Sequence, residues 1–134
     1  MALTKAEQLA AIQGDPAAVA AFLFNPDRDD CTWQGVAGQV HDMQDRPVTG
    51  ILVLLGGKYN GKTLNPIMMT GTALNYGPAG YEFELSSEEL LASTKKLWIQ
   101  LVDQSYIPLS SKIYFDTFTD CNKNLIIINF KQVR

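Results

Sequence analysis

Residues 35–55 read GVAGQVHDMQDRPVTGILVLL, and this stretch decides the fold class. Residues 35–41 alternate between two faces, which is typical of a β-strand. Residues 51–55 form an unbroken apolar run, the pattern of a strand buried on both sides. Pro47 lacks the amide proton that a central strand needs, so it marks a strand start or an edge position. The stretch therefore predicts a strand, a polar turn and a second strand.

The same pattern recurs 61 residues further along the chain, in LWIQLVDQSYIPLSSKIYFDT. Asp42 and Pro47 align without a gap on Asp103 and Pro108. Two explanations stay open, a structural repeat and a coincidence of strand and turn chemistry. Under either explanation, both segments predict a hairpin of the same plan.

Length and charge limit the classes of function. A chain of 134 residues is long enough to form one domain with its own core. Its net charge is -3 and it has no run of basic residues, which disfavours a nucleic-acid partner and an anionic membrane surface. No apolar segment approaches the roughly 20 residues that span a bilayer. We therefore expect no nucleic-acid partner and no membrane span.

The two cysteines, Cys31 and Cys121, precede the first and the last of the predicted strands. They lie outside any CxxC spacing, so a local metal pair or redox motif is not expected. If the two strands are neighbours, a disulfide would close a loop of about 90 residues, and the chain-entropy model credits such a loop with about 4 to 5 kcal/mol. Two unrelated thiols are the alternative. A disulfide indicates an oxidising compartment.

The N-terminal residues carry helix signals. Thr4 and Glu7 fit a capping box, and Asp15 followed by Pro16 fits the start of a second short helix. The sequence therefore predicts a helical arm and linker over residues 1–28, before a sandwich domain over residues 29–134. The arm either packs on its own domain or docks on another chain, through the apolar residues Leu9, Ile12, Val19, Phe22 and Leu23.

Acidic and polar residues interrupt the apolar centre that an export signal needs at this end of the chain. Together with the expected disulfide, this predicts an extracellular or cell-surface setting for a segment of a longer exported protein. Further strands are expected over residues 81–85, 97–102, 112–117 and 124–130, with turn signals between them. About seven strands without long helices predict a mainly β protein, an antiparallel two-sheet β-sandwich.

Residues 35–85 contain GVAGQVHD, RPVTGILVLLGG and GPAGYEFEL, and they resemble the carboxypeptidase regulatory-like domains. In that family a G-x-V strand is followed by an aspartate, a proline and a glycine, and later by a G-x-Y-x-F strand. The remainder is similar to uncharacterised exported bacterial proteins. The resemblance implies an Ig-like or prealbumin-like (transthyretin-like) sandwich and no particular activity, and the matching residues are Gly38, Val40, Asp42, Pro47, Gly50, Gly80, Tyr81 and Phe83.

Few residues point to catalysis or metal binding. His41 is the one histidine, and we expect it on the surface at the end of a strand, without the buried partners of a catalytic triad. Asp120, Asn122 and Asn124 alternate like the start of a calcium loop, but the glycine and the closing acid are missing. We expect a plain turn there, no metal, no cofactor and no enzymatic activity.

Sugar-binding sites use exposed aromatic planes beside polar side chains, and Trp33, Tyr59, Tyr76, Trp98 and Tyr106 are the candidates. The two tryptophans fit core or edge packing better. The sequence predicts a non-catalytic extracellular module with a structural or protein-interaction role, and the alternative is a carbohydrate-binding module appended to a secreted enzyme. The predicted contact surface combines two glycine-rich loops and consists of Tyr59, Asn60, Lys62, Asn75 and Tyr76.

Overall fold

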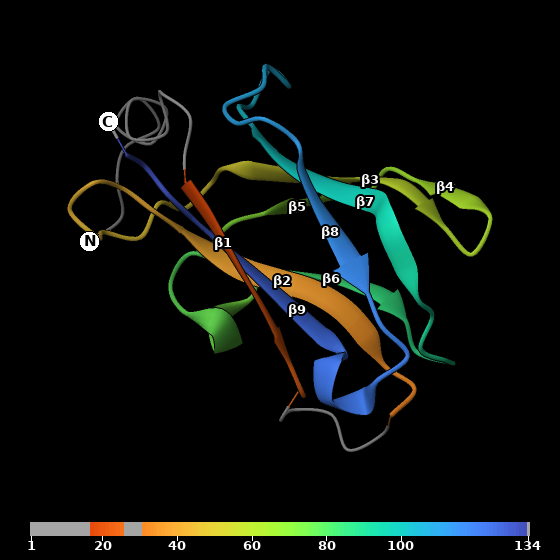
Figure 1. Ribbon diagram of the computed structural model, residues 1–134. Helices are drawn as coiled ribbons and strands as arrows, with labels where there is room; N and C mark the ends of the chain where they lie inside the picture. Colours follow the sequence, from red (N-terminus) through yellow and green to blue (C-terminus); the bar gives the residue numbers. More distant parts are fainter. Residues whose placement is uncertain (1–16, 26–30, 134) are drawn as a thin grey trace.

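The computed structural model describes residues 17–25 and 31–133. These residues form a mainly β structure of two sheets that pack face to face (Figure 1). The strands are β1 (Ala17–Leu23), β2 (Gln34–His41), β3 (Leu52–Tyr59), β4 (Lys62–Leu64), β5 (Ile67–Met69), β6 (Gly80–Ser86), β7 (Ser93–Val102), β8 (Ile113–Thr117) and β9 (Leu125–Lys131). Two short 3-10 helices, η1 (Leu74–Tyr76) and η2 (Cys121–Lys123), complete the elements.

One sheet has the order β1-β9-β2-β6 and the other has the order β4-β3-β7-β8, with β5 also paired to β3. The predicted two-sheet sandwich is confirmed, with more strands than the expected seven. One pairing departs from the expected antiparallel pattern, because β9 lies parallel to β2. β9 thus lies between β1 and β2.

The parallel pair explains the disulfide. Parallel neighbours begin at the same end of a sheet, so the residues that precede β2 and β9 come together. Cys31 and Cys121 form the expected disulfide at that end, with their Cα atoms 5.1 Å apart. The Gly35 amide donates to the Asn124 carbonyl at 3.0 Å beside it. The start of β2 is therefore tied both covalently and by hydrogen bonding to the start of β9.

The predicted second helix is wrong for residues 17–23, which form the edge strand β1. Val19 lies opposite Asn129 in an antiparallel ladder with β9, and Leu23 lies opposite Leu125. The alanine-rich segment has local helix propensity, but the edge of β9 offers a row of backbone partners that outweighs it. The first predicted helix, with Leu9 and Ile12, lies outside the described residues.

The core lies between the two sheets and is built from alternate residues of their strands. Fully burying a large apolar side chain contributes about 1.5–3 kcal/mol. The facing side chains come from both sheets: Val36, Val40, Tyr81, Phe83, Ile126, Ile128 and Phe130 from one, and Val53, Leu55, Tyr59, Leu97, Ile99, Leu101 and Phe115 from the other. Trp33 is buried in a smaller cluster with Ala37 and Leu125, which confirms the prediction that Trp33 packs in the core.

At Gly38 the backbone of β9 leaves no room for a side chain on β2. A Cβ atom at this position would overlap the carbonyl group of Ile128. That carbonyl accepts a hydrogen bond of 2.6 Å from the buried Tyr81 hydroxyl, and the Asn129 side chain accepts the Gln39 amide at 2.9 Å. Burial raises the pKa of Tyr81 well above its ordinary value, so the hydroxyl stays a donor. Side chains thus replace ladder bonds where the backbones crowd.

Replacing Gly38 by alanine is expected to destabilise the protein by about 3 kcal/mol or more, because the added methyl group meets backbone rather than a mobile side chain. Gly61→Ala is the control. No atom lies within 4 Å of the Cβ position there, so the cost is only that of the left-handed backbone, about 1 kcal/mol. Urea unfolding measures both values, and equal losses would contradict the close approach.

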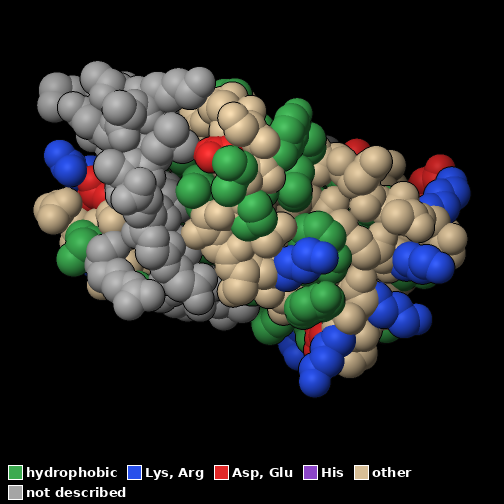
Figure 2. Space-filling view, turned by 90° about the horizontal axis from the view of Figure 1, so that it is seen from above, with side chains coloured by type: hydrophobic (Ala, Val, Ile, Leu, Met, Phe, Trp, Pro, Cys, Tyr) green, Lys and Arg blue, Asp and Glu red, His purple; other side chains and the backbone are tan. Residues whose placement is uncertain are grey.

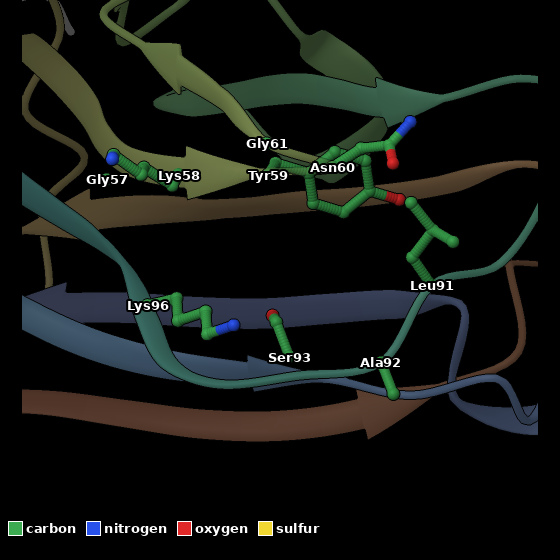
Figure 3. A pocket seen from close by; sticks show the side chains of 9 residues that line it. All are labelled: Gly57, Lys58, Tyr59, Asn60, Gly61, Leu91, Ala92, Ser93 and Lys96. Carbon is green, nitrogen blue, oxygen red and sulfur yellow. The ribbon is translucent and has the colours of Figure 1, made fainter.

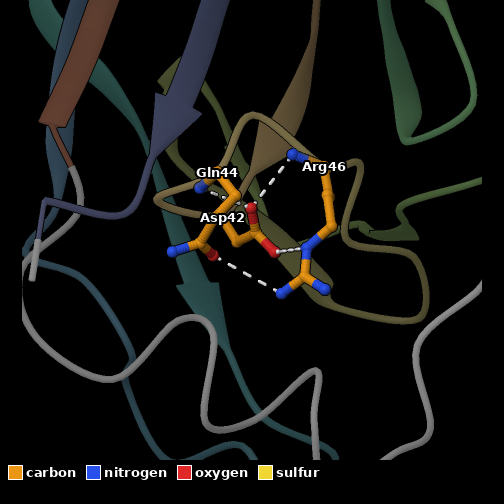
Figure 4. Close-up of polar contacts among 3 residues, drawn as sticks. All are labelled: Asp42, Gln44 and Arg46. Carbon is orange, nitrogen blue, oxygen red and sulfur yellow. Dashed lines mark hydrogen bonds and ion pairs between the residues drawn. The ribbon is translucent and has the colours of Figure 1, made fainter.

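The polar turn after β2 is organised by the buried carboxylate of Asp42 (Figure 4). Its Oδ1 atom accepts the amides of Gln44 at 2.8 Å and Arg46 at 2.9 Å, and its Oδ2 atom accepts the Arg46 guanidinium at 2.7 Å. Burial alone would raise the pKa of Asp42, but these hydrogen bonds outweigh it and lower the pKa below its usual value near 3.8.

The turn at Asp103 repeats this geometry. The Asp103 carboxylate accepts the amides of Ser105 at 2.8 Å and Ile107 at 3.0 Å, at the positions that match Gln44 and Arg46. Asp45 and Tyr106 also match, with φ angles of 61° and 64°. The recurrence in sequence therefore corresponds to a repeated turn structure.

The two turns lead into different connections. After the second turn, β8 pairs with β7 in one sheet, as a hairpin should. After the first turn, β3 enters the sheet opposite β2, so the predicted first hairpin is wrong beyond a single bridge between His41 and Pro47. The Thr70 hydroxyl fixes this crossover, since it donates to the Val48 carbonyl at 2.8 Å and accepts the Ile51 amide at 3.1 Å.

Asp42→Asn is expected to cost about 1.5–3 kcal/mol at pH 7, because the buried bond to the guanidinium is lost. Asp103→Asn is the matched control and should cost under about 0.5 kcal/mol, since an asparagine oxygen still accepts both amides. Because the folded-state pKa of Asp42 is lowered, its contribution is present above about pH 4 and is lost as the pH falls further. The free energy of unfolding, measured from pH 7 to pH 2, should therefore converge for the wild type and Asp42→Asn. A constant difference would contradict this role.

Candidate functional site

An open groove with a volume of about 550 Å³ lies between the end of β3 and the start of β7 (Figure 3). One wall is the turn between β3 and β4, and the other is the segment that leads into β7. The volume falls in the range of small-molecule sites, roughly 300–1,000 Å³. The lining residues are Gly57, Lys58, Tyr59, Asn60, Gly61, Leu91, Ala92, Ser93 and Lys96.

The groove exists because the first residues of β7 do not pair with β3. The two strands pair as far as Gly57 and Leu97. Before Leu97 the register of β7 against β8 shifts, Lys95 has a φ angle of 52°, and the Lys95 amide donates to the Asp116 carboxylate at 2.9 Å. The first residues of β7 therefore follow β8. β3 instead continues into a tight turn to β4, whose Asn-Gly sequence favours two residues of positive φ.

A buried glutamine, Gln34, forms hydrogen bonds to both walls of the groove. Its Oε1 atom accepts the Tyr59 hydroxyl and, at 3.3 Å, the Leu91 amide. Its Nε2 atom donates to the carbonyls of Leu91 at 3.1 Å and Phe118 at 2.9 Å. All four hydrogen-bonding positions of the amide are thus used. The groove is shaped by bonds inside the protein.

Tyr59 lies in the predicted contact surface but not as an exposed aromatic plane. Its side chain is only 7% exposed and belongs to the core between the sheets. Burial raises the pKa of its hydroxyl, which remains a donor to Gln34. The expectation of an exposed aromatic plane at Tyr59 is wrong, because β3 extends to residue 59. The alternation of Val53, Leu55 and Tyr59 toward the core was the sequence signal that could have predicted the burial of Tyr59.

The other predicted contact residues do not form one surface. Asn60 lines the groove, and Lys62 is exposed on β4 beside it. Asn75 and Tyr76 lie in η1, which packs on β6 and β2 of the opposite sheet, and Figure 1 shows this helix far from β4. The Tyr76 hydroxyl donates to the Glu82 carboxylate. The predicted surface is therefore split between two sheets.

Two lysines, Lys58 and Lys96, line the groove and are exposed. The two ion pairs within residues 17–25 and 31–133 are Arg46 with Asp42 and Lys131 with Asp45, so neither groove lysine has a described counter-charge. Lys96 did not stand out in the sequence, because only the topology brings residues 91–96 beside the end of β3.

A smaller hollow of about 420 Å³ lies beside β8, lined by Phe22, Lys95, Tyr114, Phe115 and Asp116. Phe22 belongs to the predicted docking arm. Its ring meets Phe118 edge to face at 5.0 Å, so it packs on its own domain while staying partly exposed. Leu23 is also exposed, at the end of β1.

Within the part of the chain that the structure describes, no group of three or more His, Cys, Asp or Glu side chains could hold a metal ion. Asp120 accepts the Asn122 amide at 2.9 Å and caps η2, so the expected turn at this position is a short 3-10 helix. His41 is half-buried at the end of β2. No helix among the described residues is long and apolar enough to cross a membrane.

Neither a family model nor a curated protein matches the chain in sequence comparisons. Fold and site together define a disulfide-linked β-sandwich with a preformed groove at one end of a sheet.

Replacing Gln34 by leucine is expected to destabilise the protein by about 3 kcal/mol, because it leaves several buried polar groups without partners, each worth about 1–3 kcal/mol. Tyr59→Phe is the control and should cost about 1 kcal/mol, since Gln34 keeps its other three bonds. Chemical denaturation measures both. If the two variants lose the same small amount of stability, Gln34 does not hold the groove.

Proposed function

We propose that this protein is a non-catalytic extracellular module that binds a segment of another protein. The open edge strand β5 carries the proposal. Ile67, Met68 and Met69 are 40%, 38% and 39% exposed, and no charged residue lies between Lys62 and Glu82 in the sequence. Natural edge strands are usually protected by charges or cover. An uncharged apolar edge is therefore suited to a partner strand.

The backbone of β5 is arranged for strand addition. The Pro66 carbonyl accepts the Leu55 amide at 3.1 Å, and the Thr70 amide donates to the Ile51 carbonyl at 2.9 Å. Backbone polar groups alternate in direction along an antiparallel strand, so those of Ile67 and Met69 point away from β3. Among the described strands, β5 pairs with β3 alone. An extended peptide can add there, and the flexible methionines can adapt to its side chains.

Two further observations support the extracellular part of the proposal. The disulfide between Cys31 and Cys121 is typical of proteins that fold in an oxidising compartment. Membership of the carboxypeptidase regulatory-like domains is part of the same proposal, supported by the two-sheet fold and by the structural roles of Gly38 and Tyr81. The alternative, sugar binding by Tyr59 and Tyr76, loses support because Tyr59 is buried.

A random peptide library displayed on phage tests the proposal. We expect the protein to enrich extended peptides with alternating apolar residues. Ile67→Pro should weaken their binding at least tenfold, because proline removes an amide at the open edge without removing a bond to β3.

Ile67→Val is the matched control and should bind as the wild type does, since it keeps the amide and the apolar surface. The proposal fails if no peptide is enriched, or if Ile67→Pro binds the enriched peptides as tightly as the wild type.

A further inference from the structure

The two lysines of the groove stand where β3 and β7 separate. Lys58 and Lys96 come next after the ladder pair of Gly57 and Leu97, one on each strand. Both side chains are exposed, and neither forms an ion pair among the described residues. Two exposed cations on the walls of an open groove favour an anionic ligand.

Aromatic side chains continue the surface beyond the lysines. Trp98 lies opposite Gly56 in the ladder, and its ring covers that glycine so closely that a Cβ there would overlap the indole. The Lys112 ammonium lies 4.4 Å from the centre of the ring. Tyr114 is the neighbour of Trp98 on β8 and is exposed. Cations and aromatic faces thus alternate on the outer surface of this sheet.

The protein as a whole has a net charge of -3, and the Glu89 carboxylate lies near enough to Tyr59 at the groove to act on it electrostatically. Figure 2 looks down on the molecule from the side of β3 and β7, and lysine and arginine side chains gather on its right-hand part beside hydrophobic ones and a few acidic ones. The groove adds neutral hydrogen-bonding groups, since Ser93 and Asn60 line it. The surface therefore offers cations, a flat ring and polar groups together.

We propose that the groove and the adjoining Trp98 bind an acidic polysaccharide, whose carboxylate or sulfate groups pair with Lys58 and Lys96. A sugar unit stacks its ring face on the indole of Trp98. It displaces the Lys112 ammonium from that face of the indole. An acidic polypeptide offers the same charges but no flat ring to stack. The site lies at the opposite end of β3 from the segment that pairs with β5, so it is independent of the proposed peptide site.

Affinity electrophoresis in native gels tests this proposal with four polymers: polygalacturonate, dextran sulfate, neutral dextran and polyglutamate. The wild type should be retarded by polygalacturonate, dextran sulfate or both, which distinguishes carboxylate from sulfate recognition, and not by dextran. The double variant Lys58→Gln/Lys96→Gln should bind at least tenfold more weakly, and Trp98→Ala should also bind more weakly.

The charge-matched control is Lys123→Gln/Lys131→Gln, which changes the net charge equally, at η2 and β9 instead of the groove, and should bind as the wild type does. Ile67→Pro should also leave retardation unchanged. Trp98→Ala removes packing over Gly56, so circular dichroism checks whether this variant folds. If Trp98→Ala unfolds, the proposal is judged on the Lys58→Gln/Lys96→Gln variant, whose side chains are exposed. The proposal is overturned if neither acidic polysaccharide retards the protein, if both double variants weaken binding equally, or if polyglutamate binds as tightly as the polysaccharides.

Discussion

The buried side-chain amide of Gln34 is the constraint on which the site depends. It projects from the first residue of β2 and bonds to Tyr59 of the opposite sheet, to Leu91 and to Phe118. A buried polar group without a partner costs about 1–3 kcal/mol, so each of the four bonds favours this one arrangement of the walls. The walls of the groove are therefore positioned by the interior of the protein, and a ligand would meet a site that is already formed.

Gln34 is itself held by the topology of its sheet. The disulfide fixes Cys31, three residues earlier, and the next residue, Gly35, donates its amide to Asn124 before β9. Because β9 lies parallel to β2, the residues that precede β9 fix the position of the start of β2. β3 then carries both proposed surfaces, the peptide edge where it pairs with β5 and the groove at its other end. Under the two proposals, a peptide and a polysaccharide would bind without competing for the same residues.

Local chemistry made the turns and the sandwich predictable. An aspartate that accepts two later amides acts within its own turn, so the match of Asp42 and Asp103 in sequence corresponded to a match in structure. The disulfide was predictable because its cysteines precede the first predicted strand and the last. β1 was not, since only the distant β9 outweighs its helix propensity. The groove was not either, because Gln34 and Leu91 are 57 residues apart and only the folded chain joins them.

The Gln34 amide fixes the groove before any ligand binds. Nuclear magnetic resonance of the side-chain amide protons of Gln34 in the free protein tests this directly. We expect two well-separated resonances that exchange slowly with solvent and show proximity to Leu91 and Phe118. Rapidly exchanging resonances at the positions of exposed glutamines would contradict it.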